Sequence, residues 1–70
     1  MTDAQFDVLV KLMRGNKASP ANRAARRVLV ESIAESIAGR EVGAARQTVH
    51  TTVERYERAH QLVLAAYSPG

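Results

Sequence analysis

Apolar residues recur at helical spacing along most of the 70-residue chain, and this periodicity restricts its fold more than any other feature. Phe6, Leu9, Val10 and Met13 stand at positions i, i+3, i+4 and i+7, which places them on one face of an amphipathic helix. No stretch alternates between apolar and polar residues for long enough to predict a strand. The sequence therefore predicts an all-α domain of four to five helices.

Local signals mark the limits of the first two helices. The first is expected over about residues 3–14, and the Gly15-Asn16 pair should end it, because glycine tolerates a positive φ. Ser19 is a favourable N-cap, and Pro20 suits the first position of a second helix, where no amide donor is needed.

The third and fourth helices follow after short connections. Ser32 and Glu35 have the spacing of a capping box, which predicts that Ser32 caps a short third helix. A long fourth helix is expected from near Ala45 to Ala66 or Tyr67, with residues 68–70 (Ser-Pro-Gly) ending it. Neither Ala44 nor Ala45 is a good N-cap for this helix.

Residues 33–53 have the features of a helix-turn-helix. Ala38 or Gly39 supplies a small residue where the two helices would cross, and Gly43 supplies a glycine in the turn. The apolar residues that would lock the second helix onto the first are Val42, Val49 and Val53. Helical bundles without DNA-binding activity can show the same spacing, so the pattern alone is only moderately specific.

If those valines face inward, a polar face of the fourth helix faces outward. Its side chains are of the types that read base edges, since arginine pairs with guanine and glutamine with adenine. The predicted base contacts are Arg46, Gln47, His50 and Thr51. The alternative interpretation is an idle solvated face, but such faces usually carry lysines and alternating charges.

Positive charge is concentrated early in the chain. The net charge is +3, and the segment from Lys11 to Arg27 holds six basic residues and no acidic one. This block is either a surface for a polyanion or a solvated helix face, and charge alone does not separate the two. The predicted phosphate contacts are Lys17, Asn22, Ser36, Arg40 and Arg55.

Several other functions are not supported by the sequence. There is no cysteine, and His50 and His60 lie ten residues apart without clustered carboxylates, so we expect no metal site. No serine is paired with a base and an orienting acid, and no glycine loop could cradle a phosphate. We therefore expect no enzymatic activity and no cofactor. The longest apolar run, Leu62–Tyr67, is far shorter than a membrane span, and no secretory segment opens the chain.

Three runs together resemble a known family. They are Ala25-Arg26-Arg27-Val28-Leu29-Val30-Glu31-Ser32, then Arg46-Gln47-Thr48-Val49 after Gly43, and Val53-Glu54-Arg55-Tyr56. Over residues 24–56 the chain resembles the TrfB/KorA family of plasmid transcriptional repressors, which carry a similar Val-Leu-Val run before a helix-turn-helix. The resemblance implies a plasmid-encoded bacterial repressor in the cytoplasm that binds double-stranded DNA at palindromic operators as a homodimer. It also implies base contacts by Arg46 and by Thr51, which stands where the best-known member has glutamine.

The end of the fourth helix predicts a second surface. Residues 59–70 carry no charged side chain, and the helix is apolar nearly all round there, which one small domain cannot cover. We expect residues 1–70 to form a single DNA-binding domain in which residues 56–67 mediate dimerisation, taking the place of the separate dimerisation domain of longer family members. The predicted interface residues are Tyr56, His60, Leu62, Val63, Leu64 and Tyr67. The alternative function is a small helical interaction module, an anti-activator or assembly adaptor, that docks a partner protein through this tail.

Overall fold

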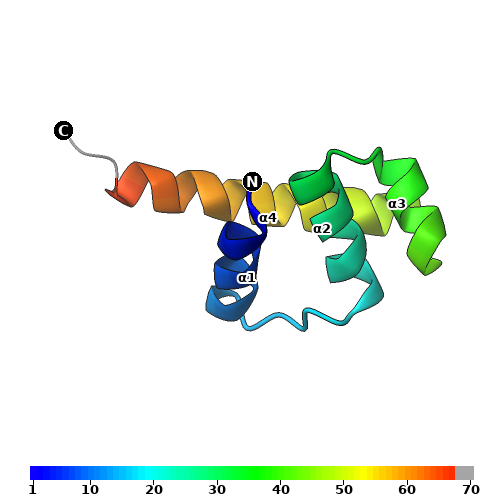
Figure 1. Cartoon of the computed structure of the whole chain (residues 1–70), viewed down its shortest axis with the longest axis horizontal. Helices are drawn as coiled ribbons and strands as arrows, with labels where there is room; N and C mark the ends of the chain where they lie inside the picture. Colours follow the sequence, from blue (N-terminus) through cyan, green and yellow to red (C-terminus); the bar gives the residue numbers. More distant parts are fainter. Residues whose placement is uncertain (68–70) are drawn as a thin grey trace.

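The computed structural model describes residues 1–67 and confirms an all-α fold of four helices. They are α1 (Asp3–Leu12), α2 (Pro20–Glu31), α3 (Glu35–Val42) and α4 (Arg46–Tyr67). The molecule is elongated, with extents of 42 × 21 × 18 Å. Helix α4 runs along its length, and the C-terminal turns of α4 extend beyond the other helices (Figure 1). The expected stop at residues 68–70 lies outside the described residues.

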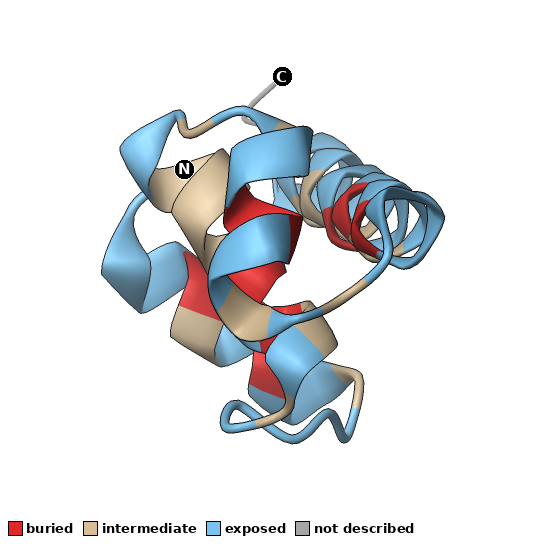
Figure 2. Cartoon of the chain, turned by 90° about the vertical axis from the view of Figure 1, so that its right-hand side faces the viewer, coloured by how far each residue is buried: buried red, intermediate tan, exposed pale blue. Residues whose placement is uncertain are grey.

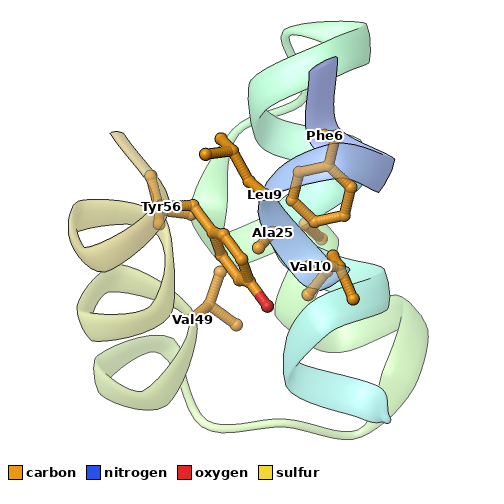
Figure 3. Close-up of a cluster of buried hydrophobic side chains, with 9 residues drawn as sticks. Phe6, Leu9, Val10, Ala25, Val49 and Tyr56 are labelled. Carbon is orange, nitrogen blue, oxygen red and sulfur yellow. The ribbon is translucent and has the colours of Figure 1, made fainter. Parts of the chain in front are cut away.

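The core lies where α1, α2 and α4 meet. Phe6 and Val49 are fully buried, and the Phe6 and Tyr56 rings stack at a tilt with centroids 5.0 Å apart. Figure 3 shows these side chains from α1 and α4 converging with Ala25 of α2. The buried alanines of α2 allow close approach of its neighbours, and the buried parts of the helices face one another (Figure 2). Burial of this apolar stripe is what stabilises helices as short as α1 and α3.

The end of α1 differs from the sequence prediction. The left-handed residue is Arg14, with φ 54°, and not Gly15. Gly15 is needed for space, because a Cβ atom there would lie 2.7 Å from the Tyr56 hydroxyl oxygen.

The expected capping box at the start of α3 is wrong. Ser32 ends α2 in a left-handed conformation with φ 58°, so it cannot also cap α3. Ala34 takes the N-cap position of α3 without a side-chain hydrogen bond. The Glu35 carboxylate takes no part in a capping box and contacts α4 instead. By contrast, Ser19 caps α2 as predicted and accepts a hydrogen bond from the Asn22 amide at 3.2 Å.

Candidate nucleic-acid interface

Helix α3 packs against the first turns of α4 through small side chains, as the sequence predicts. Ala38 and Gly39 are buried, and a Cβ atom on Gly39 would lie 2.8 Å from the Ala44 carbonyl oxygen and 3.2 Å from Val49. Gly43 ends α3 in the left-handed region with φ 71°, so the turn uses the one residue type that adopts this conformation without strain. Val49 and Val53 are buried on the inner face of α4.

This packing leaves a polar ridge on the outer face of α4, which we define as Arg46, Gln47, His50, Thr51 and Glu54. All five side chains are exposed. The Gln47 amide donates to the Thr51 hydroxyl across one helical turn at 3.4 Å. Arg46 forms no ion pair with any other residue between 1 and 67. Its guanidinium is therefore free to meet an external acceptor.

His50 is held between two carboxylates. Its Nδ1 lies 3.0 Å from one Glu35 oxygen, and its Nε2 lies 3.2 Å from Glu54, one turn further along α4. The hydrogen bond to Glu35, together with the nearby negative charges of both carboxylates, raises the pKa of His50 above its ordinary value. The protonated ring offsets part of the negative charge that these carboxylates place on the ridge.

Glu35 is a neighbour of the ridge that the sequence does not predict. Its spacing from Ser32 predicts a capping box, and no local spacing links it to His50, fifteen positions later. The contact exists because α3 crosses α4 at this point. Pairing of this kind depends on tertiary structure, so the sequence carried no signal for it.

Half of the basic block is paired within the domain: Lys17, Arg26 and Arg27 form ion pairs, whereas Lys11, Arg14 and Arg23 are exposed and form none with residues 1–67. Arg26 donates from Nε and Nη2 to the two oxygens of Asp3 at 2.6 and 2.7 Å. Arg27 donates in the same bidentate way to Glu41 at 2.9 and 2.8 Å. Hydrogen bonds to these arginines lower the pKa of both Asp3 and Glu41.

These bidentate pairs join different helices. Asp3 lies on α1, both arginines on α2 and Glu41 on α3, while Glu31 near the end of α2 contacts both arginines. The two arginines of the block therefore fix α1 and α3 on either side of α2.

The predicted phosphate contacts divide into three groups. Ser36 and Arg40 of α3 and Arg55 of α4 are exposed. Lys17 is also exposed, but its ammonium pairs with Asp7 at 2.9 Å. Asn22 is only 8% exposed, and its amide donates to the Asn16 carbonyl at 2.6 Å. That amide is committed inside the protein, so Asn22 is removed from the set.

The predicted dimer residues fall into two groups, one in the core and one at the surface. Tyr56 is 3% exposed and belongs to the core, because its ring packs on Phe6, so its assignment to an interface is corrected. His60 and Val63 are half-buried. Leu62, Leu64 and Tyr67 are exposed.

Metal-binding groups and membrane-spanning helices are both absent from the part of the chain that the structure describes. Within residues 1–67, no three His, Cys, Asp or Glu side chains gather in a way that could hold a metal ion. None of the described helices combines the length and apolar character needed to cross a membrane.

Comparisons with protein families, with curated proteins and with solved structures found no match to this chain.

Proposed function

We propose that this chain is a sequence-specific DNA-binding transcriptional repressor that acts as a homodimer on a palindromic operator. The observation that carries the proposal is the exposed ridge of α4, which begins with Arg46, an arginine that pairs with no residue between 1 and 67, and which α3 backs in a helix-turn-helix arrangement. In such motifs the N-terminal residues of the second helix enter the major groove. Arg46 and Gln47 occupy that end of α4.

The roles of the ridge residues follow from their chemistry. Arg46 presents a guanidinium fork that matches O6 and N7 of guanine. Gln47 can pair bidentately with adenine, while Thr51 offers a hydroxyl group and a methyl group that packs on thymine. Both ring nitrogens of His50 contact carboxylates, so His50 donates to a base only when DNA displaces Glu54 from its Nε2.

Phosphate contacts would flank the ridge. Arg40 and Ser36 on α3 and Arg55 on α4 are exposed donors on the two helices of the motif. Contacts of this kind set the position of a protein on the duplex but do not read its sequence. Lys17 joins them only if DNA displaces Asp7 from its ammonium.

A homodimer would place two ridges on successive half-sites and, on an operator that overlaps a promoter, would exclude RNA polymerase. The resemblance of residues 24–56 to the TrfB/KorA family supports a plasmid-encoded bacterial repressor. The exposed apolar end of α4 supports association of two copies, since a large apolar patch on a monomer promotes aggregation unless it is covered.

Selection of duplexes from a random library on the immobilised protein tests the proposal. The retained duplexes should share an inverted repeat, and their binding in gel-shift experiments should weaken steeply between 50 and 200 mM salt, on the order of a thousandfold if six phosphates are neutralised. Random duplex should bind far more weakly at the same salt concentration. Failure to retain any duplex at 50 mM salt would contradict a DNA-binding function.

The same apolar end of α4 favours one other function, a helical interaction module that docks a different protein. Leu62 and Tyr67 are both exposed large apolar side chains that a partner protein could cover. Such a module would bind its partner with little dependence on salt and would not retain DNA, so the gel-shift experiment separates the two functions.

A further inference from the structure

The last turns of α4 form an exposed apolar segment, which we call the tail and define as residues 59–67. It contains no charged side chain. Leu62 is 66%, Leu64 47% and Tyr67 83% exposed. In Figure 1 the tail extends past α1, so α1 covers only part of it.

An apolar groove lies between α1 and the tail. Its volume is about 240 Å³, and its walls include Val8 and Leu9 of α1 and His60, Val63 and Leu64 of the tail. Val8 is 53% exposed, and Leu12, one turn further along α1, extends the apolar surface beyond the groove. At about 100° per residue, Tyr67 lies on the same side of α4 as the groove. Leu62 lies on the opposite side, where it lines a separate hollow with Arg55 and Arg58. The groove and Tyr67 therefore belong to one face of the molecule.

We propose that this face is the homodimer interface and that the tail of each copy lies in the groove between α1 and α4 of the other copy. The occupant is a second copy because an apolar projection and an apolar groove stand side by side on the same surface. A two-fold dimer needs a surface that is complementary to itself, so that residue i of one copy meets residue j of the other and the reverse. The position of the two ridges in this dimer matters only under the proposed function, on which this proposal rests in that respect.

The position of the groove around α4 suits a DNA-binding dimer. At about 100° per residue, His60, Val63 and Leu64 are centred about 120° around the helix from the middle of the ridge. A copy docked in the groove stands beside the ridge and does not cover it. Both ridges then remain open for a duplex.

The size of the face also suits a dimer. A standard interface buries about 800 Å² per partner from about 20 residues a side. The residues of α1 and the tail that are exposed on the groove side include Val8, Leu12, Leu64 and Tyr67, and the accessible surface of the whole chain is 4761 Å². A stable dimer would thus cover about a sixth of the surface. The absence of charge on the tail favours an apolar partner surface of the same kind, since there is nothing on the tail for a charged partner to pair with.

Sedimentation equilibrium of the full chain tests the interface without DNA. The wild-type chain should sediment at twice its 7.6 kDa mass. Val8→Glu and Leu64→Glu should each weaken dimerisation by about a hundredfold or more, because each buries an unpaired carboxylate. Ala65→Glu is the matched control, since it adds the same charge to the tail on the side away from the groove and should leave the dimer intact.

Circular dichroism of each variant shows whether the helices still form, which we expect because Val8 and Leu64 are exposed in the monomer.

A cross-linking experiment gives a second readout that does not depend on a disruptive substitution. The chain has no cysteine, so Val8→Cys and Leu64→Cys chains can be mixed and oxidised. A disulfide between the two different chains is expected, whereas an Ile37→Cys chain on α3 should not cross-link to either.

The inference is overturned if the wild-type chain is monomeric at about 100 μM, if both glutamate variants remain dimeric, or if the mixed chains fail to cross-link. These outcomes are distinguishable from a failure of DNA binding. A dimer that cross-links as expected but retains no DNA would contradict DNA binding alone. A monomer that retains DNA would contradict the interface and the homodimer but not DNA binding.

Discussion

Arg46 is the side chain that can show whether the ridge reads bases. Replacing it with alanine should cost about 1–3 kcal/mol of binding on a selected operator and should relax the preference at one base position. The physical reason is the loss of a bidentate pair with guanine from a guanidinium that no residue between 1 and 67 engages. Gel-shift titrations on operator and random duplexes measure both effects.

Arg55→Ala is the matched control for Arg46→Ala, because it removes the same charged group from the same helix. As a phosphate contact, Arg55 should weaken operator and random DNA alike and lower the slope of log K against log salt by about one. Equal losses on both duplexes from Arg46→Ala would contradict direct reading of bases by the ridge.

His50 makes the pairing between α3 and α4 dependent on pH. Its pKa in the folded protein is raised above the ordinary value of 6.5 by the hydrogen bond to Glu35 and by the charge of Glu54. The stabilising contribution is therefore complete below about pH 6.5 and is lost as the pH rises through the folded-state pKa. The melting temperature of the wild-type chain should exceed that of His50→Gln by more at pH 6 than at pH 8.5.

A direct NMR titration of the His50 ring checks the same prediction. In wild-type protein the ring should titrate above 6.5, and Glu35→Gln should move its pKa downward, because the amide cannot stabilise the imidazolium as the carboxylate does. The same ring pKa in both proteins would show that Glu35 does not hold the proton on His50.

Residue periodicity predicts that the ridge is exposed, but it does not predict the ion pairs between helices. The inward valines at positions 49 and 53 left Arg46 and Thr51 outside, because the 3.6-residue period alone determines that outcome. The partners of His50, Arg26 and Arg27 lie on other helices, and their identity depends on how those helices cross. Sequence spacing contains no information of that kind.

At the scale of the elements, the crossing of α3 over α4 depends on Gly39. Gly39→Ala should destabilise the domain by up to about 2 kcal/mol, because the added Cβ meets the Ala44 carbonyl oxygen at 2.8 Å and the backbone must shift, at a cost of about 1–3 kcal/mol. This strain outweighs the gain in helix propensity of about 1 kcal/mol that alanine brings. Urea denaturation followed by circular dichroism measures the difference.

Arg40→Ala is the control for the Gly39 substitution, since Arg40 is an exposed neighbour on the same helix. Its free energy of unfolding should stay within about 0.5 kcal/mol of wild type. A Gly39→Ala protein as stable as the Arg40→Ala protein would show that α3 can move away from the turn without cost.

The sequence predicts the end of a helix correctly where one residue type strongly favours the backbone conformation found there. Ser19 and Pro20 began α2 as expected, and Gly43 took the left-handed position that ends α3. Ser32 was misassigned because serine suits both an N-cap and, in this chain, the left-handed end of the preceding helix. Tyr56 was misassigned because its place in the apolar stripe fits either an interface or the core, and only the position of Phe6 on α1 decides between them.

At the scale of the whole molecule, α4 links the ridge to the tail as one continuous helix of 22 residues. His50 lies in the middle of the ridge, and the tail residues that line the groove, His60 to Leu64, are centred twelve residues further along α4. Twelve residues correspond to about 18 Å along the helix axis. In the proposed dimer, a two-fold axis through the groove would double this distance to about 36 Å for antiparallel tails and to less for tails that cross at an angle. Half-sites on one face of a duplex lie about 34–36 Å apart over one helical turn.

This geometry predicts an operator whose half-site centres are about ten base pairs apart. Inserting five base pairs between the half-sites should reduce dimer binding to the level of a single half-site, because the second half-site then faces the opposite side of the duplex. Inserting ten restores the face but adds about 34 Å, which a continuous helix cannot span, so affinity should remain low. Full recovery with the ten-base-pair insertion in gel-shift titrations would show that the two ridges are flexibly joined, and it would contradict a dimer in which α4 rigidly couples the ridge to the groove.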